Sequence, residues 1–187
     1  MSYIFYMPGW ANVRPLQTSD IDPRLHTGLN AVQHRHAADA IQSLSSNCAT
    51  DLGNHGISTG GVALKAASIE YYSTIFEGDY KISELVPSFD DRALAAAVGT
   101  SNAVTLVDAY GSITHSVVLG AGYFSFNPNR EYGRTLAESQ NITLVHESLH
   151  VYTGRDDIAL AEKMGPGQYG SIEAASQAIS TYLSKCY

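Results

Sequence analysis

The chain has 187 residues, of which 44% are hydrophobic and 16% are charged, and its formal net charge is −7. This length and apolar content suit one domain over residues 1–187 with a substantial core, and disordered chains usually carry more charge. The acidic balance argues against nucleic acid as a main partner, because such proteins neutralise phosphates with an excess of Lys and Arg. No apolar run reaches the roughly 18 residues of a transmembrane helix, so we expect no membrane span.

The amino-terminal half is expected to be mainly helical. Three prolines interrupt residues 1–24, which predicts an irregular arm. Over residues 28–44 the apolar positions recur at steps of three and four, as on one face of a helix. The same spacing predicts a second helix over residues 62–76, although residues 69–72 also fit a strand.

The middle of the chain changes from helical to β character. Two aspartates, an alanine-rich run and a glycine predict a short capped helix over residues 90–99. Residues 104–109 and 113–119 are rich in Val, Ile and Thr and flank a turn-like spacer, which predicts a hairpin. Residues 123–126 are expected to extend this small sheet.

Helical spacing returns over residues 134–152, and shorter helices are expected over residues 158–164 and 171–183. The predicted fold class is therefore α+β. It combines a helical amino-terminal half, a small β-hairpin or sheet, a long helix and carboxy-terminal helices.

The long helix contains the segment 146–150, which reads HESLH and is an HExxH motif. His146 and His150 stand one turn apart, so both rings can direct a nitrogen at one cation. Glu147 can then take a proton from a metal-bound water. Zinc suits the pattern because neutral imidazole binds it well and it has no redox chemistry. The alternatives are solvated surface histidines, or a His and a Glu that only bond to each other.

A catalytic zinc site usually has three protein ligands, so a third must lie outside the motif. Asp157 is our first candidate and Asp156 the second, because Gly154 can end the helix and turn the chain back towards the histidines. Glu173 on the last helix is a third candidate. Asp157 can also serve as the N-cap of the helix over residues 158–164.

The segment 146–150, followed by Thr153-Gly154, Asp157 and Leu160-Ala161, resembles the zincin zinc metallopeptidases, and most of all the branch with an aspartate as third ligand. The resemblance implies a zincin-like domain, one zinc ion per chain and a protein or peptide substrate. It also implies hydrolysis of peptide bonds by a metal-activated water, with Glu147 as general base.

Two further features are expected from the same resemblance. A tyrosine hydroxyl often assists the oxyanion in zincins, and Tyr152 and Tyr169 are the candidates, although packing roles are the alternative for both. An edge strand upstream of the active helix commonly pairs with extended substrate. Residues 113–119 or 123–126 are the candidates for that strand, and an ordinary core hairpin is the alternative.

Cys48 and Cys186 show no CxxC spacing, so neither a zinc ribbon nor a thioredoxin-type pair is indicated. They either form one disulfide or remain two buried thiols. A disulfide would point to an oxidising compartment and hence to a secreted or otherwise extracytoplasmic protein. Residues 1–10 lack the features of a signal peptide, so a secreted peptidase and a toxin or effector module of a longer chain are both open.

Two other functions remain as alternatives. The first is a non-catalytic binding module that keeps the HExxH helix without metal or with a structural zinc ion. The second is a metal-dependent amidase that acts on cell-wall peptides.

Overall fold

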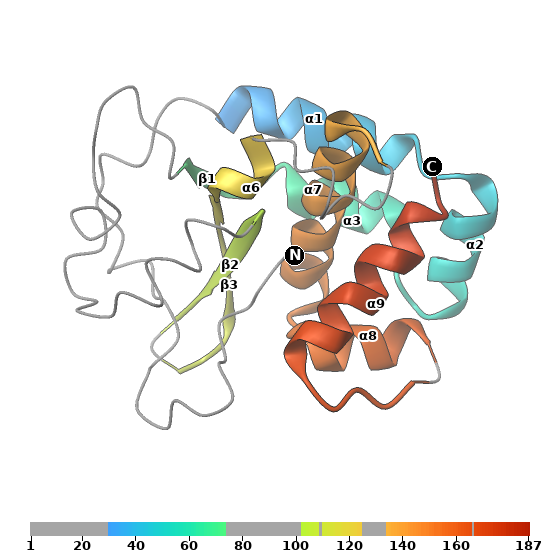
Figure 1. The fold of residues 1–187 in the computed structure, drawn as a ribbon. Coiled ribbons are helices and arrows are strands. Elements are labelled where there is room, and N and C mark those ends of the chain that lie inside the picture. Colours follow the sequence, from blue (N-terminus) through green and yellow to red (C-terminus); the bar gives the residue numbers. More distant parts are fainter. Residues whose placement is uncertain (1–29, 74–101, 109, 125–133, 166) are drawn as a thin grey trace.

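The computed structural model describes residues 30–73, 102–108, 110–124, 134–165 and 167–187. Within these residues the chain forms seven helices and one three-stranded sheet (Figure 1). The expected α+β class is therefore confirmed. The arm predicted over residues 1–24 and the helix predicted over residues 90–99 lie outside the described residues.

Three helices open the described chain. Helix α1 (Asn30–Gln42) confirms the first predicted helix. Helix α2 (Ser46–Asn54), which the sequence spacing did not predict, begins where the Ser45 side chain accepts the backbone N–H of Cys48. Helix α3 (Thr59–Ala66) is capped in the same way by Ser58.

The helix expected over residues 62–76 is wrong beyond Ala66. The chain leaves the helix after that residue and forms strand β1 (Glu70–Ser73), where Tyr71 and Tyr72 are buried. Pairing with a neighbouring strand and burial of two aromatic rings override the helical spacing here. The strand that residues 69–72 also fitted is the observed alternative.

The predicted hairpin is confirmed as strands β2 (Ala103–Val107) and β3 (Ile113–Leu119), which pair antiparallel. The Asp108 carboxylate closes the turn by accepting the backbone N–H groups of Tyr110 and Ser112. Strand β1 pairs parallel to β3, so the strand order is β1-β3-β2. Residues 113–119 thus form the central strand of the described sheet, and their expected role as an edge strand for substrate is wrong.

The expected strand over residues 123–126 is also wrong where the structure describes it. Residues Ala121–Phe124 form the short helix α6, and residues 125–126 lie outside the described part. The Tyr123 side chain is buried and its hydroxyl donates to the amide oxygen of Gln33 on α1. This hydrogen bond joins α6 to α1.

The three remaining helices were predicted to within two residues at each end. Helix α7 (Leu136–Thr153) begins with a capping box between Thr135 and Glu138. Helix α8 (Asp157–Met164) has Asp156 as its N-cap, and α9 (Ile172–Ser184) has Ser171. The N-cap role that the sequence left open for Asp157 therefore belongs to Asp156.

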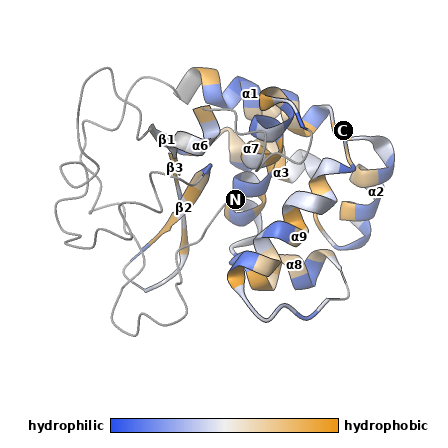
Figure 2. Cartoon of the chain, in the orientation of Figure 1, coloured by the Kyte–Doolittle hydropathy of each residue, from blue (hydrophilic) through white to orange (hydrophobic). Residues whose placement is uncertain are grey.

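Helix α7 lies at the centre of the fold, between the sheet and α9 in Figure 1, and it also contacts α1 and α3. Every residue from Ile142 to Val151 is buried. Apolar side chains from one face of the sheet join the helices in a single core cluster, namely Tyr71, Ala103, Val117 and Leu119. Figure 2 shows hydrophobic stretches in β2 and β3, whereas hydrophilic residues interrupt α7. The buried middle of α7 therefore carries the polar HExxH residues into the core.

The carboxy terminus is fastened to α2 by a disulfide between Cys48 and Cys186. The Tyr182 hydroxyl on α9 adds a hydrogen bond of 2.8 Å to the Asp51 carboxylate on α2. Of the two states that the sequence left open for the cysteines, the structure has the disulfide.

Among the residues described, no helix combines the length and apolar character needed to cross a membrane.

Candidate metal centre

The two histidines of the HExxH motif lie side by side in the core. They stand one turn apart on α7, and their rings stack with centroids 4.8 Å apart and planes inclined by 30°. Both side chains have no exposed surface. The helical spacing thus brings two imidazoles to one point, as the sequence predicted.

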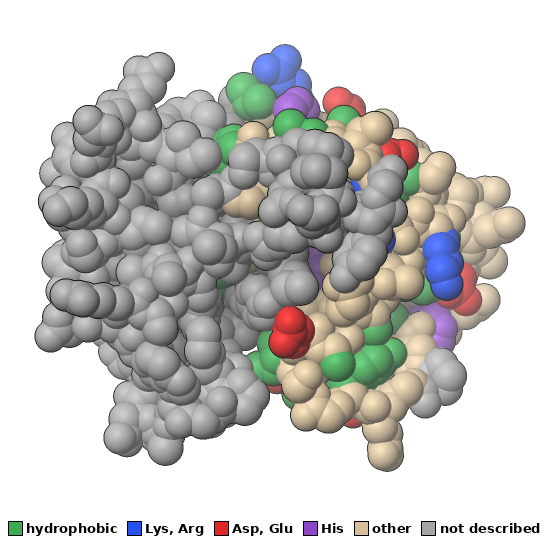
Figure 3. Space-filling model, viewed as in Figure 1, with side chains coloured by type: hydrophobic (Ala, Val, Ile, Leu, Met, Phe, Trp, Pro, Cys, Tyr) green, Lys and Arg blue, Asp and Glu red, His purple; other side chains and the backbone are tan. Residues whose placement is uncertain are grey.

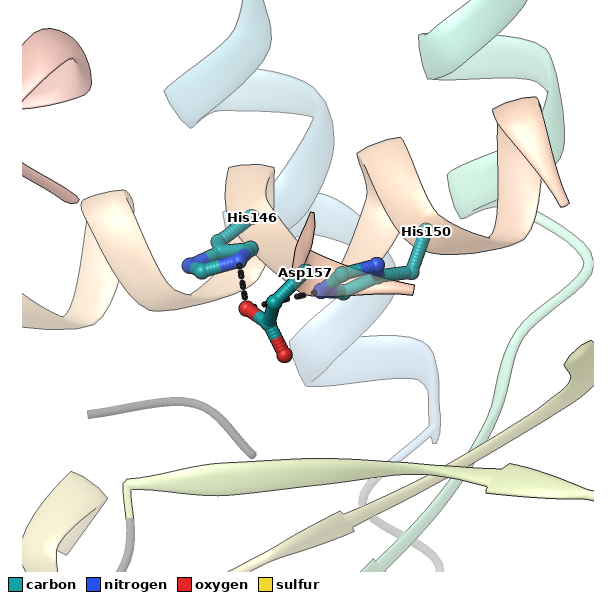
Figure 4. A group of neighbouring side chains, drawn as sticks. All are labelled: His146, His150 and Asp157. Atoms are coloured by element: carbon teal, nitrogen blue, oxygen red, sulfur yellow. Dashed lines mark hydrogen bonds and ion pairs between the residues drawn. The ribbon is translucent and has the colours of Figure 1, made fainter. Parts of the chain in front are cut away.

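Asp157 completes this group (Figure 4). Helix α7 ends at Gly154, whose φ of 64° is the left-handed conformation that glycine adopts without strain. After this turn Asp156 caps α8, and Asp157 begins it with a fully buried carboxylate. Oδ1 of Asp157 lies 3.1 Å from Nε2 of His146 and 3.5 Å from Nε2 of His150.

The spacing of these three side chains suits a small divalent cation. The potential ligand atoms of His146, His150 and Asp157 all lie within 4.8 Å of one another. Bonds of about 2.0–2.2 Å in tetrahedral zinc sites place neighbouring ligand atoms about 3.3–3.5 Å apart, close to the two His–Asp distances. The Nε2 atom of His150 is buried and faces Oδ1 of Asp157 across 3.5 Å, which is long for a hydrogen bond. A cation bound among the three side chains would take this nitrogen as a ligand.

The orientation of His150 is set by the turn that follows the helix. Its Nδ1 lies 2.6 Å from the backbone carbonyl oxygen of Arg155, so Nδ1–H donates to that oxygen and Nε2 faces Asp157. A second hydrogen bond of this kind is typical of metal-binding histidines, because it fixes the ring and its tautomer. The Gly154 turn therefore positions both Asp157 and the ring of His150.

The electrostatics of the metal-free centre favour a charged His–Asp pair. Burial lowers the pKa of His150, but the Asp157 carboxylate and further hydrogen bonds outweigh it and raise the pKa to about 9. Burial raises the pKa of Asp157, but the nearby His150 charge and hydrogen bonds from both histidines hold it well below its usual range. A dication would take the place of the His150 proton as the partner of this carboxylate.

Glu147 is also completely buried, and strand β2 holds one of its two carboxylate oxygens. The Thr105 hydroxyl donates to Oε2 at 2.5 Å, whereas Oε1 has no hydrogen-bond partner among the described residues. The charge of Glu147 also contributes to raising the pKa of His150, so the two groups are electrostatically close. A buried carboxylate with one free oxygen is costly unless a proton, a water or a ligand group meets it.

The structure separates the other predicted site residues from this group. Asp156 is exposed and its carboxylate accepts the backbone N–H of Ala159 as the cap of α8. Glu173 is exposed in the first turn of α9. Neither belongs to the cluster of His146, His150 and Asp157, which among the described residues is the one that fits a metal ion. Of the three candidates for the third ligand, the structure supports Asp157.

The two tyrosines pack against glycines. The Tyr152 ring lies so close to Gly61 of α3 that a Cβ at that position would clash with it. The Tyr169 ring lies in the same way against Gly167, in the segment that joins α8 to α9. These contacts agree with the packing roles that the sequence left open, and they give no support to a part in oxyanion stabilisation.

The sequence analysis missed two groups that contact the HExxH side chains, the Thr105 hydroxyl and the Arg155 carbonyl. Thr105 was read only as a β-forming residue, and the Arg155 carbonyl carries no side-chain signal at all. A polar residue within the otherwise apolar run Ala103–Val107 was the available hint for Thr105. No sequence pattern indicates which backbone carbonyl a histidine ring will meet.

On the face shown in Figure 3, the described part carries scattered acidic and basic side chains, and hydrophobic side chains gather near α8 and α9. Four large hydrophobic residues are exposed among the described ones, at separate places in the sequence: Val32, Leu64, Tyr110 and Tyr187.

No family model, curated protein or solved structure matches this chain.

Proposed function

We propose that this protein is a zinc-dependent peptidase of the zincin type. One observation carries the proposal: His146, His150 and Asp157 converge within 4.8 Å in the core, and Glu147 lies on the same helix between the two histidines. The donor set of two imidazoles and one carboxylate is that of catalytic zinc sites, which keep a fourth position for water or substrate.

Each residue has a definite task in this proposal. His146, His150 and Asp157 would hold the ion, and the Arg155 carbonyl keeps the His150 ring in place. Zinc would supply a Lewis acid that polarises the scissile carbonyl and activates a water. Among the described residues Oε1 of Glu147 has no hydrogen-bond partner, so it is available to accept the proton of the attacking water and to return it to the leaving amine.

The substrate class in this proposal is a protein or peptide. The Cys48–Cys186 disulfide is compatible with an extracytoplasmic protein, because such bonds persist in oxidising compartments. A secreted peptidase and a toxin or effector module of a longer chain both agree with this feature.

The proposal is tested by exchanging the general base. Glu147→Gln keeps the size of the side chain but removes its basicity, and Glu162→Gln changes an exposed glutamate on α8. We expect Glu147→Gln to retain about one zinc ion per chain while casein hydrolysis falls by about a hundredfold or more. Glu162→Gln should behave like the wild type. Casein hydrolysis by Glu147→Gln at the wild-type rate would contradict the proposed mechanism.

The complete burial of the three donors favours a second candidate, a structural metal site in a non-catalytic module. A structural ion would stabilise the fold without supporting hydrolysis. One zinc ion per chain, a large loss of thermal stability on its removal and no hydrolysis of casein or of peptidoglycan would identify this function. Hydrolysis of peptidoglycan alone would identify the cell-wall amidase.

A further inference from the structure

Helix α7 is joined to strand β2 by two buried side-chain hydrogen bonds. Thr105 on β2 donates to Oε2 of Glu147, and Asn102 just before β2 donates through Nδ2 to the Thr143 hydroxyl at 3.3 Å. Thr143 and Glu147 lie one turn apart on α7, so β2 and the residue before it contact two successive turns. Both threonines are buried, with 2% and 3% of their surface exposed.

The two hydrogen bonds differ in the group that the α7 side chain offers, which is a hydroxyl in Thr143 and a carboxylate in Glu147. The Thr143 hydroxyl accepts from Asn102 and donates to the backbone carbonyl of Ser139 within α7. This contact therefore serves packing between the strand and the helix. The Thr105 hydroxyl instead reaches an acidic side chain with no exposed surface. It leaves Oε1 of that carboxylate without a hydrogen bond in the described part of the fold.

The strand fixes the position of the Thr105 hydroxyl. Thr105 pairs with Val117 on β3. The register of the two strands shifts between Thr105 and Val107. At this shift the Thr114 hydroxyl of β3 donates to the Leu106 carbonyl. A β-branched side chain in a paired strand has few accessible rotamers. Strand pairing therefore fixes the backbone of Thr105, and β-branching restricts the direction of its hydroxyl.

We propose that Thr105 is a positioning residue: it anchors Oε2 of Glu147 so that Oε1 faces the His146, His150 and Asp157 centre in one fixed orientation. This inference rests on the proposed peptidase function. A carboxylate that is free to rotate would present either oxygen, or neither, to the attacking water. A misplacement of about 1 Å at a reacting group can lower a rate by about a hundredfold.

The test compares three variants of the full chain. Thr105→Val removes the hydroxyl and keeps the shape, Thr105→Ser keeps the hydroxyl, and Thr143→Val removes the matched hydroxyl that does not touch Glu147. With zinc bound, we expect Thr105→Val to lower kcat for peptide hydrolysis by about a hundredfold with little change in KM. Thr105→Ser should recover most of this loss, and Thr143→Val should keep the wild-type kcat.

A second measurement does not depend on activity. In metal-free protein labelled with ¹³C at the glutamate carboxyls, the Glu147 resonance is assigned by its loss in Glu147→Gln. We expect Thr105→Val to shift this resonance and Thr143→Val to leave it in place. An unshifted resonance in a folded Thr105→Val protein, or equal shifts in both valine variants, would overturn the proposal.

The two measurements also separate this inference from the proposed function. If the wild-type protein hydrolyses no peptide, the peptidase proposal fails, and the resonance alone decides whether Thr105 orients Glu147. If the wild type is active and Thr105→Val retains the full kcat, the positioning role fails while the peptidase stands.

Discussion

Asp156 and Asp157 are neighbours in the chain, but their carboxylates have opposite surroundings. The Asp156 carboxylate is exposed and accepts the backbone N–H of Ala159. The Asp157 carboxylate is fully buried, 3.1 Å from Nε2 of His146. Asp156 thus caps α8, and this turn places the Asp157 carboxylate beside His146 and His150.

This division of labour predicts different effects for two substitutions. Asp157→Asn keeps the shape but removes the negative ligand, so we expect the protein to lose most of its zinc. Asp156→Ala removes only a helix cap, which should cost about 1 kcal/mol of unfolding free energy. Elemental analysis and thermal melts of the two purified variants distinguish them. Zinc loss in Asp156→Ala but not in Asp157→Asn would reassign the third ligand.

The metal content should also depend on the two histidines of the motif. His146→Ala and His150→Ala each remove one of three ligands, and we expect both proteins to lose most of their zinc after dialysis. His36→Ala, which changes an exposed histidine on α1, is the matched control and should keep the ion. Equal zinc content in all three variants would show that the metal binds elsewhere.

A substitution at Gly154 tests whether the turn after α7 supports zinc binding through His150. A Cβ there meets no atom within 4 Å, so Gly154→Ala adds backbone strain at a φ of 64° without a clash. Gly111, at the tip of the β2–β3 hairpin, has a φ of 82° and equally open surroundings, and Gly111→Ala is the matched control. Both substitutions should cost about 1–2 kcal/mol of stability.

The two glycine variants should differ in zinc affinity. Gly154 precedes the Arg155 carbonyl that holds His150, so we expect Gly154→Ala to weaken zinc binding by about tenfold to a hundredfold. Gly111→Ala should leave it unchanged. Competition titrations with a chelator measure the two affinities, and equal values would show that the turn does not support the centre.

The sequence analysis succeeded where structure depends on residues close together in the chain and failed where it depends on distant ones. Helix α7 and the hairpin were predicted because their patterns are local, and His146 and His150 are fixed by helical spacing alone. The helix after Ala66 was wrong because the partner of β1 is more than forty residues away, on β3. Thr105 was missed for the same reason, since a threonine in a strand does not reveal which distant carboxylate it meets.

Protonation of the metal-free centre makes zinc binding dependent on pH. With its pKa raised to about 9, His150 is protonated at pH 7 and must lose that proton to bind the ion. We expect about one proton to be released per zinc ion at pH 7, and fewer as the pH rises past 9. Calorimetry in buffers of different ionisation enthalpy measures this number. Release of no proton at pH 7 would show that His150 is neutral in the metal-free protein.

The same pair predicts how the stability of the metal-free protein varies with pH. The raised pKa of His150 contributes stability that is complete below its unfolded pKa of about 6.5 and is lost as the pH rises through about 9. The depressed pKa of Asp157 contributes stability above its unfolded value of about 3.9, and this is lost on further acidification. Melting temperatures of the metal-free wild type should therefore fall from pH 6.5 to pH 9.5, and His150→Ala should show a smaller fall. Parallel profiles for the two proteins would contradict the charged pair.

The Cys48–Cys186 disulfide closes a loop whose ends are 138 residues apart in sequence. Such a loop restricts the unfolded chain strongly, and the chain-entropy model gives a stabilisation of about 5 kcal/mol. The double variant Cys48→Ala, Cys186→Ala should therefore lose a large part of its unfolding free energy in urea titrations. Tyr182→Phe is the matched control, because it removes a non-covalent link between α2 and the end of α9, four residues before Cys186, and should cost only about 1 kcal/mol. A double variant that loses no more than Tyr182→Phe would mean that the other contacts of α2 and α9 already hold the carboxy terminus. Because neither cysteine is in the His146, His150 and Asp157 group, the folded double variant should still bind zinc.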